Sequence, residues 1–419
     1  MWRPNPATVA LGVIGVVIAA LGLWTGRADV LAFGVAPIVA AFTLTGHRPE
    51  FATGQRFVEA PSEAGVFAAD LTLEPADEAA LLLVRAFAPG HRPRTVAVAA
   101  RPARHLSLQA RSARTGPSRT FDVQARAISQ GAAYVEDPRA GSAAPRLVLP
   151  LARRLAAVPL PTRLRGLTGP RRSHRFGDGT ELRDVHPMAP GDQARRVDWR
   201  ATARRSPELS ELYIRRTFAT AEAQGMLVLD SRDEVGSDLS QWFGSEALRV
   251  DEATSLDLAR TAAISIATAF TDAGDRIGLV DLARPRRPLA PAMGRRHLRR
   301  IQYALAVAAP FGEPTPHLRP PQLPSDAIVY LLTTLLDDAP LDLVRGWQSQ
   351  GLPVVVIDTL PAIRPVTHTH LLLAWRITTM ERADRLRALQ AQHIPVVRWA
   401  DRAAAPEQLA ASARERGRR

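Results

Sequence analysis

The chain has 419 residues, enough for two or three domains that each bury a core of their own. It has no Cys, which excludes disulfides, thiolate metal sites and a cysteine nucleophile. The net charge of +13 comes from 54 basic residues, all Arg and scattered along the chain, whereas aromatic residues make up only 5%. Nucleic-acid binding needs a local basic patch with stacking aromatics, so we attribute this charge to genomic base composition and expect no nucleic-acid partner.

The first fifty residues, 1–50, are predicted to form a transmembrane helical hairpin. The run from Pro4 to Gly26 has no charge and is long enough to cross a hydrocarbon core of about 30 Å. A second uncharged run, 30–46, is shorter and contains Pro37, which a membrane helix tolerates when its neighbours satisfy the freed carbonyl. Because only Gly26 to Asp29 connects the two runs, we expect them to pack antiparallel, with both ends on one side.

The Arg residues around these runs predict an orientation. Arg3, Arg48 and Arg56 flank the side that holds both ends, and Arg27 alone lies in the turn. Cytoplasmic flanks carry the excess of Arg, so we expect a two-pass cell-membrane protein whose remaining domains are cytoplasmic and whose first partner is the lipid bilayer. A cleaved signal peptide is the alternative, but the first run is long, lacks a small-x-small cleavage site and is followed by a second run.

Residues 51–165 are predicted to form a β-rich, sandwich-like domain. Apolar residues there recur with period two, and turn-forming residues separate the runs. The clearest predicted strands are 79–84, 95–99, 105–109, 121–125 and 147–151. We find no cluster of carboxylates, His or nucleophiles in this domain, so we expect it to serve as a spacer.

Residues 166–224 form a segment that we call the collar. Between Pro190 and Arg204, acids and bases in it alternate around one aromatic residue. We expect Arg side chains to pair with Asp192 and Asp198 and to stack on Trp199. The collar could lock two domains together, or it could be a docking surface. If the Trp199 ring is buried, replacing Trp199 with Ala should cost on the order of 3 kcal/mol.

Strand and helix patterns alternate through residues 225–405, which predicts a parallel sheet with helices on both faces. In such sheets ligands bind at the carboxyl ends of the strands, where Asp230 and Thr333 should lie together. No Gly-rich phosphate fingerprint follows the first strand, so we expect no dinucleotide or ATP site and identify no small-molecule substrate. The remaining residues, 406–419, are predicted to be a disordered basic tail. The predicted strands are 226–230, 276–282, 327–332, 353–357 and 395–399, and the predicted helices are 255–271, 295–308, 341–349 and 380–392.

The collar closely resembles the signature of the bacterial domain of unknown function 58 family. The matching positions are Gly179, Glu181, Arg183, Pro190 to Asp192, Arg196 to Trp199, Ala203 and Arg204. The resemblance continues at 291–298 and 394–397, and this chain has His186 where the family usually has an aromatic. It implies a von Willebrand factor A-like α/β domain and a MoxR-type AAA+ ATPase as partner. It also implies a partner-binding or structural role for Glu181, Arg183, Gly191, Asp192, Arg196, Asp198, Trp199 and Arg204.

Metal-binding members of that fold carry Asp-x-Ser-x-Ser after the first strand. Here Asp230 is present, but Arg232 and Glu234 occupy both Ser positions. A second carboxylate, expected after a later strand, is replaced by Thr334. A guanidinium has the wrong charge for a ligand and could pair with Asp230 in the metal's place. We therefore expect no cofactor and a degenerate site whose weak candidates are Asp230, Thr333 and Asp337. A cation such as Mg²⁺ would need Asp233 or Asp337 to complete it.

The sequence favours a membrane-anchored, non-enzymatic protein-binding scaffold that works with a MoxR-type ATPase in protein maturation or assembly. One alternative is a cell-envelope hydrolase, for which the candidates are Asp184, His186, His368 and His370. It lacks a Ser in a nucleophile-elbow context and a carboxylate pair in a defined environment. Another alternative is a membrane protein that binds nucleic acid, which would require salt-dependent affinity and stacking on Trp199.

Overall fold

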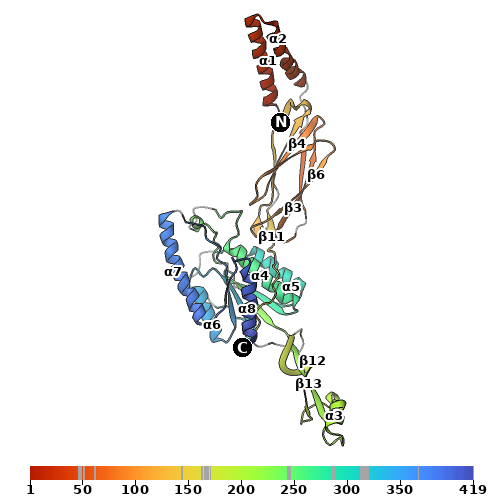
Figure 1. Cartoon of the computed structure of the whole chain (residues 1–419), viewed down its shortest axis with the longest axis vertical. Coiled ribbons are helices and arrows are strands. Elements are labelled where there is room, and N and C mark those ends of the chain that lie inside the picture. The colour runs from red at the N-terminus through yellow and green to blue at the C-terminus, as the bar shows by residue number, and fades with distance from the viewer. Residues whose placement is uncertain are drawn as a thin grey trace. The chain divides into compact units, whose positions relative to one another are not determined.

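The computed structural model describes residues 1–45, 50, 52–60, 63–142, 145–161, 164, 169, 171–242, 247–284, 288–311, 320–366 and 368–418. Arg48, used above to orient the chain, lies outside these residues. The chain is a mixed α/β protein with several sheets, and it divides into two compact units, residues 1–148 and 149–419 (Figure 1). Each unit has a hydrophobic core of its own.

The first unit contains antiparallel sheets that share one core. Phe67 and Leu71 from one sheet pack with Leu82 and Val123 from another. Each of the five strands predicted in this region has a counterpart, although the one predicted at 147–151 ends at Val148. The largest sheet has the order β1 (Trp2–Pro4), β9 (Tyr134–Glu136), β8 (Asp122–Ser129), β4 (Ala79–Phe87) and β5 (Arg94–Ala99), with β10 (Arg139–Ser142) also on β8. The others are β2 (Gly54–Glu59), β3 (Val66–Glu74) and β6 (Arg104–Arg111), and the pair β7 (Gly116–Ser118) and β11 (Arg146–Val148). A short 3-10 helix, Gln130–Ala132, follows β8.

Strand β1 was not expected, because it is three residues long and directly precedes the apolar run. Trp2 is only 3% exposed and belongs to the core of the first unit, so the extreme amino terminus is part of this β-structure. Its register on β9 pairs Trp2 with Glu136 and Pro4 with Tyr134.

Two apolar helices, α1 (Pro6–Thr25) and α2 (Ala28–Leu44), pack against each other. A Cβ at Gly22 or Gly34 would clash with the backbone of the other helix, so these glycines allow the close approach. Helix α1 is long and apolar enough to cross a membrane, whereas α2 is shorter. Pro37 is accommodated inside α2.

The helix pair is attached to the β-structure at both ends. Asn5, the N-cap of α1, donates its backbone N–H to the carbonyl of Ala133 at 2.7 Å. At the end of α2, the hydroxyl of Tyr134 donates to the carbonyl of Thr45 at 2.8 Å. The chain therefore leaves and re-enters the β-structure of the first unit beside one segment, residues 132–134.

The second unit contains a six-stranded sheet. Its order is β16 (Leu289–Ala292), β15 (Arg276–Asp281), β14 (Gln224–Leu229), β17 (Ile328–Thr333), β18 (Val354–Asp358) and β19 (Val396–Arg398). All neighbouring strands are parallel except β16, which pairs antiparallel with β15. The associated helices are α4 (Ser255–Asp272), α5 (Arg295–Val307), α6 (Ala339–Ser349), α7 (Thr369–Ala391) and α8 (Ala404–Arg418), with a 3-10 helix at Leu239–Gln241.

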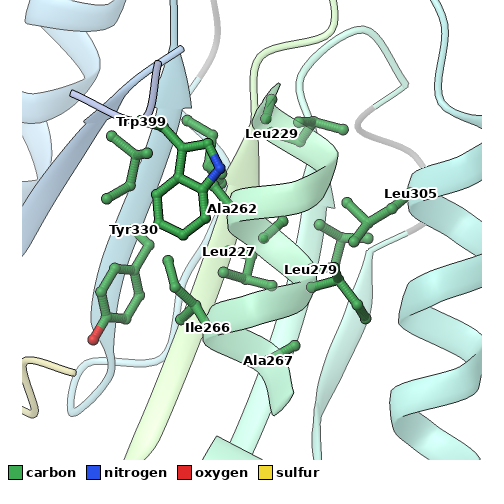
Figure 2. Close-up of a cluster of buried hydrophobic side chains, with 14 of the residues drawn as sticks. Leu227, Leu229, Ala262, Ile266, Ala267, Leu279, Leu305, Tyr330 and Trp399 are labelled. Atoms are coloured by element: carbon green, nitrogen blue, oxygen red, sulfur yellow. The ribbon is translucent and has the colours of Figure 1, made fainter. Parts of the chain in front are cut away.

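Helices cover both faces of this sheet, as the alternating pattern predicted. On one face, Ile266 and Phe270 of α4 and Leu305 of α5 pack with Leu227 and Tyr330, a cluster that Figure 2 shows in part. On the other face, α6 and α7 pack through Leu343, Val344, Trp347 and Leu389 against alternate residues of the same strands. Buried strands of this kind read as continuous apolar runs, which is why the sequence identified them.

Four features of this unit differ from expectation. Helix α7 begins at Thr369, eleven residues before the predicted start at 380, and β16 was not predicted. Residues 406–419 were expected to be a disordered tail, but α8 reaches Arg418 and Leu409 is fully buried in the core. Residues 149–161, which we expected in the β-rich domain, belong to the second unit, where Val158 joins the core.

Candidate functional site

The collar forms an antiparallel ribbon of β12 (Arg171–Pro187) and β13 (Tyr213–Ala221). Its base is fixed to the α/β domain through Asp275, whose side chain is fully buried. Arg171 Nη2 lies 2.6 Å from Asp275 Oδ2, and the backbone N–H of Ala223 donates to Asp275 Oδ1 at 2.9 Å. A buried carboxylate that accepts hydrogen bonds from both segments ties the ribbon firmly to the sheet.

The Pro190-Gly191-Asp192 segment is a tight turn at the far end of β12. Gly191 has φ +95°, a conformation that L side chains rarely adopt, so the turn requires glycine. The carboxylate of Asp192 closes the turn by accepting the backbone N–H of Ala189 at 2.9 Å. The same carboxylate lies 3.6 Å from His186 Nε2 and 3.8 Å from Arg216 Nη2. Gly191 and Asp192 therefore have structural roles.

Helix α3 (Trp199–Arg205) follows β12 and precedes β13 in the chain, and three side chains fix it, one of them to β13. Asp198 is the N-cap and accepts the backbone N–H of Ala201 at 3.0 Å. The hydroxyl of Thr202 accepts the N–H of Tyr213, and that of Ser206 accepts the N–H of Glu211, each at 3.0 Å. The inner side of α3, which carries these side chains, is therefore already occupied by contacts within the collar.

The outer side of α3 carries Trp199, Arg200, Ala203 and Arg204, which we call the α3 face. Helical spacing places these four residues within one arc, and all four are exposed. Trp199 is 64% exposed. The expectation that Asp198 pairs with Arg beneath a stacked indole is therefore wrong: Asp198 caps the helix, and the indole of Trp199 projects from it.

The other signature residues lie elsewhere on the ribbon. Glu181 is exposed on β12. The guanidinium of Arg183 lies 5.8 Å from the ring centre of Phe218, a cation–π contact across the two strands. Arg196 ends the 3-10 helix Ala194–Arg196.

A second candidate site lies at the carboxyl ends of the parallel strands. Asp230 follows β14, and the hydroxyl of Thr333 at the end of β17 donates to Asp230 Oδ2 at 2.9 Å, so these two residues do lie together. Arg232 Nε donates to Asp230 Oδ1 at 2.7 Å, and Nη2 donates to Oδ2 at 2.9 Å. Arg232 Nη1 reaches Asp337 Oδ2 at 2.9 Å. One guanidinium therefore bridges the two carboxylates that were candidate metal ligands.

The electrostatics of this edge follow from burial. Burial of Arg232 acts to lower its pKa, but the hydrogen bonds and charges of Asp230 and Asp337 outweigh it and hold the pKa above its ordinary value. Burial raises the pKa of Asp233 to about 6, and the neighbouring Asp230 adds to this rise. The hydroxyl of Thr334 donates to Asp233 Oδ2 at 3.2 Å and opposes it.

These residues do not fit a divalent cation. The guanidinium of Arg232 occupies both oxygens of Asp230 with hydrogen bonds, and it supplies the positive charge that a metal would bring. Within the described ranges, no group of three or more His, Asp or Glu side chains is arranged to hold a metal ion.

Two Arg residues of α7 reach the same edge, and sequence reasoning missed them. Arg382 Nη2 lies 2.5 Å from Asp358 Oδ2, and its Nε donates to the carbonyl of Thr334 at 3.0 Å. Arg385 Nε lies 2.6 Å from Asp338 Oδ1. Both Arg side chains are mostly buried, and their spacing of three residues on a helix was the one available signal.

The residues considered for hydrolysis do not form a catalytic arrangement. His186 Nε2 is 3.6 Å from Asp192, which is too long for a hydrogen bond. His368 and His370 stack on each other at the start of α7, with ring centres 5.8 Å apart. Within the described residues, we find no hydroxyl hydrogen-bonded to any of these three rings.

Comparison with known proteins supports the resemblance seen in the sequence. No curated protein and no solved structure matches the chain. The family model described as "Protein of unknown function DUF58" matches residues 184–347. The match begins on β12, runs through the α3 face and the Arg232 site, and ends in α6.

Proposed function

We propose that this chain is a membrane-anchored, non-enzymatic protein-binding scaffold that docks partners through the α3 face. The observation that carries the proposal is the position of Trp199, 64% exposed on a helix whose inner side is fixed by Asp198 and Thr202. A large indole held in solvent costs hydrophobic stabilisation that a bound partner restores. Trp is also among the residues that contribute most to binding energy at protein interfaces.

The anchor of this scaffold is the helix pair α1 and α2, which cross the membrane as two passes. Helix α1 has the length and composition for a span, and α2 at 17 residues is about 26 Å long. The attachment of both helix ends to residues 132–134 supports a hairpin that returns to its starting side. Arg3 and Arg56 on that side favour a cytoplasmic location for the rest of the chain.

The α/β domain is a von Willebrand factor A-like module, and its partner is a MoxR-type AAA+ ATPase that acts in protein maturation or assembly. Counted along the chain, the strands of its sheet have the order 3-2-1-4-5-6, which supports a doubly wound fold. Asp230 after the first strand supports the module, with Arg232 in the role of a built-in cation. The partner rests on the family resemblance.

The test is purification of the full chain from membranes of its own cell in mild detergent, followed by identification of bound AAA+ proteins. We expect a MoxR-type ATPase with the unmodified chain and with Met380→Ala, which alters a residue that is 68% exposed on α7. Trp199→Ala should lose the ATPase while keeping the same melting temperature. Recovery of no AAA+ protein with a chain that is folded would refute the proposed partnership.

A further inference from the structure

The α3 face carries donors and positive charge without a compensating acid. Arg200 and Arg204 lie one helical turn apart on the same side as Trp199, whose indole N–H is a further donor. Among the residues that the structure describes, neither Arg200 nor Arg204 has an ion-pair or hydrogen-bond partner. No internal carboxylate therefore has to be displaced before an external one can bind.

We propose that the α3 face recognises an acidic segment of a protein partner, in which carboxylates pair with Arg200 and Arg204 and an adjacent apolar side chain packs on Trp199. The proposal rests on the proposed function and adds the chemistry of the partner. A guanidinium presents its N–H groups as a planar fork that matches the two oxygens of a carboxylate. Two guanidiniums one helical turn apart should therefore bind a segment that carries two acidic side chains at a similar spacing.

The surroundings of the α3 face favour a protein over a phosphate-bearing partner. The loop after α3 exposes Glu208 and Glu211, whose carboxylates act equally on any anionic partner and do not distinguish one from another. The same loop exposes Leu209, and the strand end opposite exposes Met188, at 59% and 40%. Aromatic, Met and Arg side chains together are the composition that is enriched in protein interfaces.

The inner contacts of α3 make the proposal testable without unfolding. Thr202, opposite the α3 face, is fully buried, and Arg205 lies over the Tyr213 ring at 5.3 Å. Substitutions of Trp199, Arg200 or Arg204 leave these contacts intact. We therefore expect such variants to keep the melting temperature of the unmodified protein.

The experiment measures fluorescence anisotropy of short labelled probes with the full chain in detergent micelles. The probes are a peptide of alternating Glu and Leu, the same peptide with Gln for Glu, and an oligothymidylate of equal length. The variants are Trp199→Ala and the double charge reversal Arg200→Glu/Arg204→Glu. The matched control, Arg345→Glu/Arg387→Glu, makes the same charge change at guanidiniums that are 55% and 73% exposed on other helices.

The acidic peptide should bind and be weakened by salt, and both α3 variants should lose roughly tenfold or more in affinity while the control keeps it. The proposal is overturned by equal binding of the Gln peptide, by equal loss in the control, by tighter binding of the oligonucleotide, or by no binding at millimolar peptide. If the ATPase is captured regardless of Arg200→Glu/Arg204→Glu, this inference fails and the scaffold stands. If the peptide result holds without ATPase capture, the partnership fails and this inference stands.

Discussion

Arg232 donates a hydrogen bond to each carboxylate oxygen of Asp230, with Nε 2.7 Å from Oδ1 and Nη2 2.9 Å from Oδ2. The side chain of Asp230 is 2% exposed and that of Arg232 is 7% exposed, so neither charge is solvated by water. The pair is therefore a fixed part of the sheet edge rather than a surface ion pair.

Replacing Arg232 with Ala should destabilise the α/β domain by about 3–5 kcal/mol, because it leaves the carboxylate of Asp230 buried without its partner. Chemical denaturation measures this loss. The double variant Arg232→Ala/Asp230→Asn should recover part of it, since the unpaired charge is gone. Arg345→Ala, which breaks an exposed pair with Asp342, should change stability by less than about 1 kcal/mol. Similar losses for the two single variants would contradict this account.

Titration calorimetry of the unmodified protein with millimolar Mg²⁺ should show little heat. Mg²⁺ needs oxygen ligands in near-octahedral geometry, and the guanidinium of Arg232 already occupies the oxygens of Asp230. The double variant Arg232→Ser/Thr334→Asp should bind Mg²⁺, because it removes the competing cation and adds a carboxylate. Each single variant keeps one defect and should bind poorly. Tight binding by the unmodified protein would show that Asp233 or Asp337 acts as a ligand.

Asp233 should make stability depend on pH. Burial raises its pKa from 3.8 to about 6 in the folded state, so the folded protein holds this proton more tightly than the unfolded chain. The contribution of Asp233 to the free energy of unfolding should then fall as pH rises from about 4 to about 6, and stay low above that. Asp233→Asn still accepts the Thr334 hydroxyl and should be more stable near pH 7, by up to about 3 kcal/mol.

Denaturation of Asp233→Asn and of the unmodified protein across this pH range tests the assignment. Asp342→Asn serves as control, since the Asp342 side chain is 73% exposed on α6. Curves for Asp233→Asn and the unmodified protein that run parallel from pH 4 to pH 7 would mean that another group carries the proton.

Trp199→Ala should lower the free energy of unfolding by less than about 1 kcal/mol, since the ring is 64% exposed. The figure of about 3 kcal/mol derived from the sequence applied to a buried ring. Trp347→Ala is the matched comparison: Trp347 is fully buried and should cost about 3–5 kcal/mol. A loss of that size at Trp199 would mean that the indole packs against the protein in solution.

The two apolar runs end before the β-rich domain, so the sequence alone predicts a folded soluble protein when Met1–Gly46 is removed, but the structure changes that expectation. The deletion also removes β1 and takes Trp2 out of the core of the first unit, at a cost of about 3–5 kcal/mol. Excising only residues 6–44 and closing the gap with a short Gly-Ser linker keeps Trp2 in place. We expect the excised protein to be soluble without detergent and to melt at a higher temperature than the Met1–Gly46 deletion.

The sequence predicted the α/β domain well because its strands are buried on both faces and its helices alternate with them. That pattern alone placed Asp230 beside Thr333, since parallel strands end at one edge. The two Arg residues of α7 were missed for a related reason. Nothing in a run of charged residues tells which guanidinium folds back across the sheet, and Arg382 meets Asp358 only once α7 has packed.

The collar shows a different limit of sequence reasoning. Its acids and bases suggested mutual pairing. Asp192 does lie 3.8 Å from Arg216, but it also closes a turn, and Asp198 hydrogen-bonds a backbone N–H instead. Hydrogen bonds from a carboxylate to nearby backbone groups compete with ion pairs, and composition alone does not show which of the two a given Asp will make. In α8 the Arg residues suggested solvation, but Ala405 and Leu409 lie one turn apart and are fully buried. These two buried positions, rather than the charged residues around them, were the sequence signal for a packed helix.

Only Asn5 separates β1 from α1, and its backbone and side chain are both bonded to residues 132 and 133. These hydrogen bonds restrain the junction between the strand and the helix. A tilt imposed at the Thr25 end of α1, about 30 Å from Asn5, should therefore reach the β-structure of the first unit through residues 132 and 133.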